Sequence, residues 1–228
     1  KIKSYDAAAI KSMPGIKDVF TFQTYNDGQE TGWSDTNSFR ELIAVVGATT
    51  WEVLNAKKAL KVVWEPFKTF ETETGPPDNR RKIKTPEGLE DSKKHYAAMK
   101  KAAGKPGKVL RRDGDPEAAF KSAKKVIERH YTGPFLAHNT MEPMNFFAHV
   151  TDEKAELVGP IQTPEQMEKS VAARLGLPLD KVDIQMTRMG GGFGRRLYGH
   201  FLVEAAAISQ KMKAPVKLIY SREDDMTG

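Results

Sequence analysis

The chain has 228 residues, of which 39% are hydrophobic and 29% charged, and it contains no cysteine. This length is enough for one large domain or two small ones, and the composition is that of a globular protein. The absence of cysteine excludes disulfides, thiolate zinc sites, cysteine nucleophiles and iron–sulfur clusters held by this chain. No apolar run approaches the roughly 18 to 20 residues that a membrane-spanning helix needs.

The net charge of +6 raises the question of an acidic partner or nucleic acid. Most of the excess lies in one stretch, at Arg80–Lys84, Lys93–Lys94, Lys100–Lys101 and Lys105–Arg112. This stretch has no recurring aromatic residues on which bases could stack. It therefore favours a solvated helix or a docking surface for an acidic protein, with nucleic acid as the weaker alternative.

Residues 1–65 alternate short helices and strands. Pro14 and Gly15 end the first predicted helix, and either Thr49 or Thr50 can cap the second. The predicted helices are 6–13 and one beginning near 50, and the predicted strands are 16–22, 42–46 and 61–64. This region reads as a small α+β scaffold without visible chemistry.

Residues 66–112 turn polar, with Thr-Glu repeats, Pro76–Pro77 and the basic clusters. The composition predicts a linker that crosses a surface, with one charged helix at 88–103. So long a connection is typical of a join between domains or of a segment that a partner orders.

Residues 113–228 carry most of the predicted regular structure. Pro164 opens a helix that stops at Gly176, and the strand that follows runs directly into a glycine-rich loop. The predicted helices are 115–124, 164–175 and 198–212, and the predicted strands are 126–131, 145–150, 154–158, 182–187 and 216–220. The pattern predicts an α+β fold.

The chemistry is concentrated in the string Met189 to Arg196, which contains Gly190, Gly191, Gly192 and Gly194. Glycines after a strand let the backbone approach a ligand, and their amides beside a helix start form an anion site. Arg195 and Arg196 follow at once, and guanidinium groups suit phosphate. The string predicts a phosphate-bearing cofactor, although it matches neither the P-loop nor the spaced dinucleotide fingerprint.

Other polar residues favour structural roles. Glu142 is predicted to accept hydrogen bonds from the backbone rather than to transfer protons. His138 and His200 lack a third ligand at zinc-site spacing, so no metal is assigned to protein atoms. The run Arg222-Glu223-Asp224-Asp225 is predicted to be a surface charge cluster.

Several segments resemble one family in order and spacing. The string Gly190-Gly191-Gly192-Phe193-Gly194-Arg195-Arg196 resembles the pterin-side loop of the molybdenum hydroxylases of the xanthine oxidase family. Its Arg-Arg ending resembles the branch of isoquinoline 1-oxidoreductase beta subunits and membrane-bound aldehyde dehydrogenases. Further segments resemble that family at His138–Asn145, Gln162–Pro164 and Pro215–Met226, and Met13–Ile16, Ala44–Val46 and Ala56–Leu60 resemble its hammerhead-like domain.

The resemblance implies part of a hammerhead-like α/β domain at 1–65, a linker at 66–112 and the first part of a molybdopterin-binding α+β domain at 113–228. Gln162 would lie near an apical molybdenum ligand, and the loop would line the molybdenum and pterin side. The cofactor-binding residues it implies are Gln162, Gly190, Gly191, Gly192, Phe193, Gly194, Arg195 and Arg196.

The function implied is that of a large-subunit segment that binds molybdopterin cytosine dinucleotide with molybdenum and oxidises an N-heterocycle or an aldehyde. Electrons would leave through 2Fe-2S clusters on a small partner subunit, with a cytochrome c subunit as a further partner. Nucleic acid is not an expected partner. The branch implies a periplasmic or membrane-associated location.

Departures from the family pattern also matter. Ile161 stands where the family has Thr, and Leu197 and Tyr198 stand where the xanthine oxidase branch has a carboxylate, so purine recognition is not supported. The family's catalytic glutamate lies in a downstream motif that this sequence lacks, so no catalytic residue is assigned and we expect a segment that is inactive alone. A noncatalytic module that docks an acidic protein or nucleic acid remains the alternative.

Overall fold

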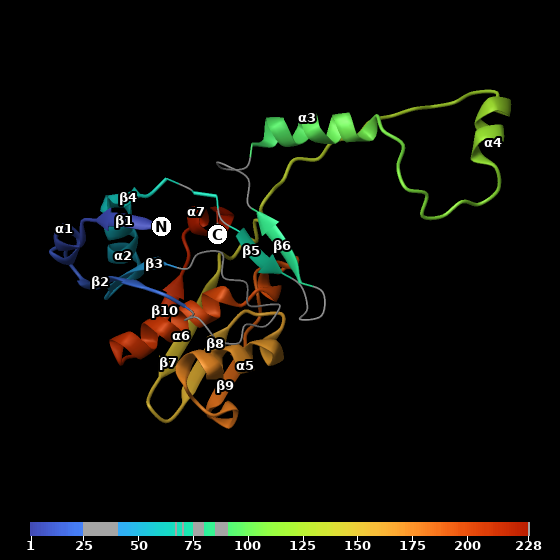
Figure 1. The fold of residues 1–228 in the computed structure, drawn as a ribbon. Coiled ribbons are helices and arrows are strands. Elements are labelled where there is room, and N and C mark those ends of the chain that lie inside the picture. The colour runs from blue at the N-terminus through green and yellow to red at the C-terminus, as the bar shows by residue number, and fades with distance from the viewer. Residues whose placement is uncertain (25–40, 67, 70, 75–79, 85–90, 228) are drawn as a thin grey trace. The chain divides into compact units, whose positions relative to one another are not determined.

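A computed structural model describes residues 1–24, 41–66, 68–69, 71–74, 80–84 and 91–227 (Figure 1). The chain divides into two compact units, one formed by residues 1–65 with 135–228 and the other by residues 66–134. We describe each unit by itself. The division into 1–65, 66–112 and 113–228 stays a prediction.

A four-stranded mixed sheet organises the first unit, with strand order β10-β7-β8-β9. β9 lies at one edge and is parallel to β8, whereas the central pair β7–β8 and the other edge pair β10–β7 are antiparallel. The strands are β7 (Asn145–Val150), β8 (Ala155–Gly159), β9 (Val182–Met186) and β10 (Val216–Ile219). All four confirm predicted strands, within a residue or two at the ends.

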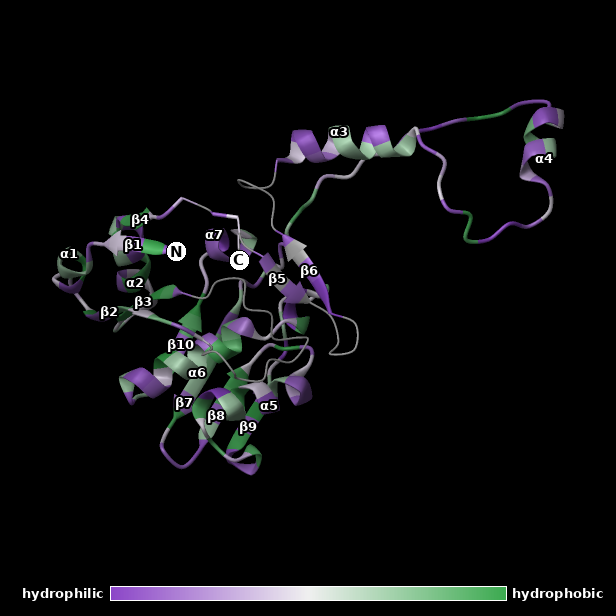
Figure 2. Ribbon diagram, in the orientation of Figure 1, coloured by the Kyte–Doolittle hydropathy of each residue, from purple (hydrophilic) through white to green (hydrophobic). Residues whose placement is uncertain are grey.

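Two helices, α5 (Pro164–Leu175) and α6 (His200–Met212), pack on one face of this sheet. Alternate residues of β7 and β8 are buried beneath them, as expected where one face of a sheet is covered. Figure 2 shows hydrophobic residues along α6 and the strands of this sheet. The predicted Pro164 start and Gly176 stop of α5 are confirmed, and Gly176 has the left-handed φ of 70°.

The N-terminal segment adds two strand pairs and two helices to the same unit. β1 (Ile2–Tyr5) pairs with β4 (Val62–Trp64), and β2 (Ile16–Phe22) pairs with β3 (Leu42–Gly47). The helices are α1 (Ala7–Lys11) and α2 (Thr50–Ala59). Phe20 and Ala44 form an apolar cluster with Ile208 of α6, so this segment packs against the large sheet's helix.

Helix α2 begins with a capping box. The Thr49 hydroxyl accepts a hydrogen bond from the Glu52 amide at 3.3 Å, and the Glu52 carboxylate accepts one from the Thr49 amide at 3.1 Å. Of the two predicted caps, the structure therefore selects Thr49, because only that arrangement satisfies two orphan amides at once.

The second unit contains a polar hairpin and two helices. β5 (Glu71–Thr74) and β6 (Arg81–Lys84) are antiparallel. Asp91 caps α3 (Ser92–Ala103) and Asp115 caps α4 (Pro116–Ser122). The predicted start of the first of these helices, 88–90, lies outside the described residues. The hairpin was not predicted, because its polar sequence lacks the apolar alternation typical of strands.

The predicted strand at 126–131 is wrong. Residues 124–134 form no helix or strand, and Val126 and Ile127 are 54% and 63% exposed. Among the described residues of this unit, the two strands pair only with each other, so this apolar run has no strand beside it.

A short helix, α7 (Arg222–Thr227), ends the described chain and was not predicted. The expectation of a surface charge cluster at 222–225 is wrong for Asp225, whose side chain is only 1% exposed and is paired with arginines. Within the described ranges, no helix combines the length and apolar character that crossing a bilayer requires. The predicted α+β class is confirmed.

Candidate cofactor-binding site

The glycine-rich loop and Gln162 follow two neighbouring parallel strands. β8 ends at Gly159 and β9 at Met186, and these two residues are direct partners in the ladder. The Thr187 amide then donates to the Gly159 carbonyl at 3.1 Å. Because both strands end at the same edge of the sheet, the connections that leave them meet there, which is the usual place for a ligand site.

The loop backbone turns sharply between Gly191 and Arg195. Gly191 and Gly194 have φ values of 102° and 91°, and Phe193 has a left-handed φ of 52° although it carries a side chain. The Arg195 amide closes the turn by donating to the Gly192 carbonyl at 2.8 Å. A left-handed Phe that is 77% exposed is a sparsely populated state, and such strain clusters at ligand sites.

Gln162 contacts the loop directly. Its side-chain Oε1 accepts a hydrogen bond from the Gly194 amide at 3.3 Å, and its backbone amide donates to the Arg196 carbonyl at 2.9 Å. A Cβ placed on Gly192 would lie 2.7 Å from Gln162 Oε1, so the close approach depends on glycine. The structure thus brings together the predicted residues of the two connections.

Glu142 supports the loop from a third segment. Its Oε2 accepts a hydrogen bond from the Gly190 amide at 2.7 Å, and its Oε1 accepts one from Asn145 Nδ2 at 2.9 Å. Partial burial raises the pKa of Glu142, but these hydrogen bonds and the charge of Arg196 outweigh it and lower the pKa below its ordinary value. The prediction that this carboxylate bonds to the backbone is confirmed.

Arg196 is buried, and its guanidinium is directed at protein carbonyls. Its Nε donates to the Gly191 carbonyl at 2.9 Å, and its Nη2 donates to the Glu142 carbonyl at 2.7 Å. A side chain that is 0% exposed cannot reach an external phosphate in this arrangement. The predicted phosphate contact from Arg196 is therefore replaced by an internal one, because the direction of a side chain depends on the fold and cannot be inferred from residue type.

Arg195 also points away from solvent, although its backbone belongs to the loop. Its Nε donates to Asp225 Oδ1 at 3.3 Å, and its Nη1 lies 3.5 Å from His200 Nε2. Sequence reasoning did not assign Asp225 or His200 to this site. The acidic run Glu223-Asp224-Asp225 after the last strand was the available signal, but such a run is typical of a solvent-exposed surface.

The loop fits a polar cofactor that approaches its backbone. Within the described residues, the amides of Gly191, Gly192 and Phe193 have no acceptor, so they can donate to a bound group. Gln162 is exposed and its carboxamide nitrogen can donate as well. No group of three or more His, Asp or Glu side chains in the described residues could hold a metal ion.

Comparison with known proteins identifies the family. A family model described as a molybdopterin cofactor-binding domain matches residues 101–228, more than half of the chain. The membrane-bound aldehyde dehydrogenase (pyrroloquinoline-quinone) of Gluconacetobacter polyoxogenes is 29% identical over 99% of this chain and 26% of its own length. The nicotinate dehydrogenase large molybdopterin subunit of Eubacterium barkeri is 35% identical over 50% of this chain and 27% of its own length.

Two solved structures share the fold over 99% of this chain. Quinoline 2-oxidoreductase from Pseudomonas putida 86 aligns with a TM-score of 0.58 at 17% identity, over 30% of its chain. Aldehyde oxidoreductase from Desulfovibrio gigas aligns with a TM-score of 0.57 at 19% identity, over 26% of its chain. The chain thus spans about a quarter of the length of the relatives quoted above. On the family match, the chain belongs to the molybdopterin cofactor-binding domain family of the aldehyde- and xanthine-type molybdenum oxidoreductases.

Proposed function

We propose that this chain is a segment of the large subunit of a molybdenum-dependent oxidoreductase that oxidises an aldehyde or an N-heterocycle. The observation that carries the proposal is the glycine loop with open amides beside Gln162, at the shared end of two parallel strands. The aldehyde and nicotinate dehydrogenases among the relatives agree with both substrate classes.

The bound molybdopterin would supply the centre that accepts electrons from the substrate. The residues of this chain would hold it, with the amides of Gly191, Gly192 and Phe193 as donors to its polar atoms and Gln162 beside them. Glu142 and Arg196 would not contact the cofactor but would hold the loop backbone in the conformation that leaves these amides accessible.

Molybdenum and pterin content of the intact protein, purified with its partner subunits, tests the proposal. In Gly192→Ala the new Cβ would displace the Gln162 carboxamide, so we expect most of the molybdenum to be lost. Gly107→Ala is the matched control, because nothing lies within 4 Å of a Cβ at that position. Absence of molybdenum from the folded wild-type complex, or full retention in Gly192→Ala, would refute the proposal.

We also propose the cytosine dinucleotide form of the cofactor, a small 2Fe-2S subunit as the electron acceptor and a cytochrome c subunit beyond it. The nucleotide released by mild acid from the purified complex identifies the first, and the iron, sulfide and haem content of co-purifying chains identifies the others. The name of the membrane-bound relative supports a periplasmic or membrane-associated location, which fractionation of cells would test.

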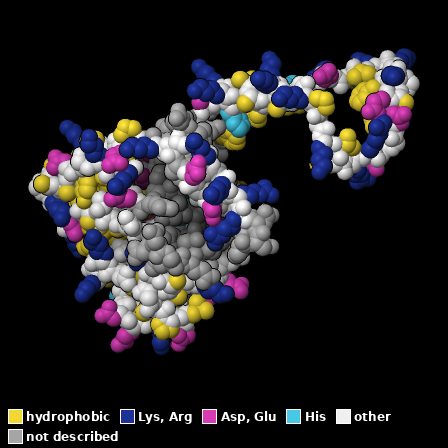
Figure 3. Space-filling model, viewed as in Figure 1, with side chains coloured by type: hydrophobic (Ala, Val, Ile, Leu, Met, Phe, Trp, Pro, Cys, Tyr) yellow, Lys and Arg dark blue, Asp and Glu magenta, His cyan; other side chains and the backbone are white. Residues whose placement is uncertain are grey.

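The basic helix α3 supports an acidic partner. None of its residues is buried within the described structure, and Tyr96 and Met99 are 44% and 50% exposed. Figure 3 shows Lys and Arg side chains along this helix. Replacement of Lys93, Lys94, Lys100 and Lys101 by Gln should weaken co-purification of the small subunit. The difference between this variant and the wild type should shrink as the salt concentration is raised. Strong salt-dependent binding to DNA instead would support the alternative of a nucleic-acid-binding module.

A further inference from the structure

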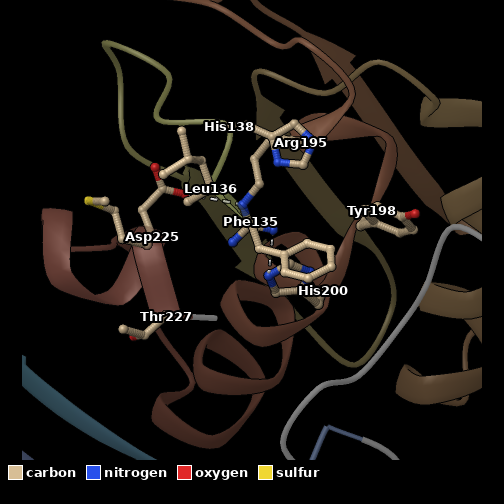
Figure 4. Close-up of a pocket in the computed structure, with 10 residues that line it drawn as sticks. Phe135, Leu136, His138, Arg195, Tyr198, His200, Asp225 and Thr227 are labelled. Carbon is tan, nitrogen blue, oxygen red and sulfur yellow. Dashed lines mark hydrogen bonds and ion pairs between the residues drawn. The ribbon is translucent and has the colours of Figure 1, made fainter. Parts of the chain in front are cut away.

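The side chain of Arg195 lines a cavity of about 410 Å³ that the cofactor proposal does not use. Three segments of the first unit form its wall: residues 135–138, residues 195–200 and the end of α7. Figure 4 shows the Arg195 guanidinium and His200 near one another, with Phe135 and Leu136 beside them. The volume lies within the usual range for small-molecule sites.

Two buried nitrogen atoms of this wall have no partner among the described residues: Arg195 Nη2 and His200 Nδ1. The Arg195 side chain is 7% exposed, and His200 is 6% exposed. A buried polar atom without a partner costs free energy, and both residues that carry these atoms line the cavity.

Both unpartnered atoms are hydrogen-bond donors. A guanidinium can only donate, so the contact between Arg195 Nη1 and His200 Nε2, at 3.5 Å, makes Nε2 the acceptor. In the neutral ring the proton then lies on Nδ1. Burial and the charge of Arg195 lower the pKa of His200 to about 4, so the ring stays neutral near pH 7. A site with two donors requires a ligand that accepts.

The charge of the wall selects an anion with a single charge. Arg195 and Arg222 share the carboxylate of Asp225, with contacts at 3.3 and 3.0 Å, so two positive groups face one negative group. The nearby Glu204 carboxyl has its pKa raised to about 7 by burial, so it adds at most part of a negative charge at neutral pH. Arg195, Arg222 and Asp225 together carry one unit of positive charge, which partial ionisation of Glu204 reduces without cancelling.

The remaining wall is mainly apolar, with His138 and Thr227 as its polar residues. Phe135 and Leu136 are 79% and 80% exposed and belong to a segment without helix or strand. Tyr198 and Met226 complete this side. From these features together, we infer that the cavity between Arg195, His200 and Phe135 binds a monocarboxylate with a small apolar or aromatic body. This site is separate from the proposed cofactor contacts and does not depend on them.

Calorimetric titration of the intact protein with benzoate tests the inference, with benzamide as the neutral analogue. We expect one benzoate site, binding of benzamide weaker by about tenfold or more, and a loss of about tenfold or more in Arg195→Gln, because each removes a charge-assisted hydrogen bond. Arg188→Gln is the control: this exposed arginine lies outside the cavity wall and its replacement changes the net charge equally.

Leu136→Asp provides a second variant in case Arg195→Gln does not fold. This exposed position tolerates a polar residue, and its new carboxylate should repel benzoate and weaken its binding by about tenfold or more. The benzoate affinity of Arg188→Gln should stay within about twofold of wild type. The inference is overturned if benzoate does not bind at about 10 mM, a level that detects even weak sites. The inference is also overturned if benzamide binds as tightly as benzoate. Inorganic phosphate is titrated in the same way, and phosphate binding that Leu136→Asp leaves unchanged would overturn the inference too.

Discussion

The Glu142 carboxylate accepts a hydrogen bond from Arg196 Nη2 at 3.2 Å, although the two residues lie 54 positions apart. The same carboxylate accepts from the Gly190 amide, and the same guanidinium donates to the Gly191 carbonyl. This ion pair therefore provides hydrogen-bond partners for both a backbone amide and a backbone carbonyl at the start of the glycine loop. A carboxylate alone would leave the carbonyl unsatisfied, and an arginine alone would leave the amide unsatisfied.

Replacing Arg196 should destabilise the whole fold. Arg196→Met takes the arginine donor away from the Gly191 and Pro160 carbonyls and removes one donor each from the carbonyl and the carboxylate of Glu142, so we expect a loss of about 3 to 5 kcal/mol in the free energy of unfolding. Urea unfolding measures it. Arg188→Met, at an exposed position, should change the stability by less than about 0.5 kcal/mol. A loss below about 1 kcal/mol for Arg196→Met would contradict the buried role.

Backbone strain at Gly194 should be separable from cofactor retention. Gly194 and Gly114 have φ values of 91° and 70°, and a Cβ would meet no atom closer than 3.7 Å at either position. Gly194→Ala and Gly114→Ala should therefore each cost about 1 to 2 kcal/mol. Only Gly194→Ala should also reduce molybdenum content, because only it moves the amide that Gln162 accepts from. Equal molybdenum in both variants would argue against the loop assignment.

Glu204 should make stability fall as pH rises. Burial raises its pKa from 4.5 to about 7, against the opposing hydrogen bond from Tyr220, so the folded state holds a proton that the unfolded state releases. This stabilisation is complete below about pH 4.5 and is lost as pH rises through about 7.

Glu204→Gln keeps a neutral side chain and removes that pH dependence. Relative to wild type, the variant should gain roughly 2 to 3 kcal/mol of stability between pH 5 and pH 8. The lowered pKa of His200 acts in the opposite sense between about pH 4 and 6.5, but it is common to both proteins and cancels in the difference. Parallel stability curves would show that Glu204 titrates normally.

The capping box of α2 should contribute measurably. Thr49→Ala removes the hydroxyl that accepts from the Glu52 amide, so we expect a loss of about 1 kcal/mol. Thr50→Ala, one residue inside the helix, removes no cap and should be neutral within about 0.5 kcal/mol. Thermal unfolding of the two variants decides between them, and equal effects would rule out Thr49 as the cap.

Elements whose ends are marked by local start and stop residues were predictable from the sequence. The helix between Pro164 and Gly176 has the predicted ends, because a proline start and a left-handed glycine stop act within one turn. The hairpin at 71–74 and 81–84 was missed because it has no apolar alternation to signal it. The run at 126–131 was misread because periodicity does not reveal whether a pairing strand exists.

The direction of a side chain was the main feature that the sequence could not supply. Arg195 and Arg196 are adjacent and chemically identical, yet one pairs with Asp225 and the other with backbone carbonyls. Composition favoured phosphate for both. Only the fold reveals that Asp225, thirty positions onward, returns to meet Arg195.

The parallel pairing of β8 with β9 also limits how the length of the chain can vary. Gly159 opposes Met186, and the short connections to Gln162 and Gly190 begin directly from these ends. An inserted residue in either connection would shift one half of the site by up to about 3.3 Å relative to the other, more than a hydrogen bond tolerates. We therefore expect insertions to be accepted in the turn between β7 and β8 and rejected at 160–162 and 187–190, even where single substitutions at those positions are harmless.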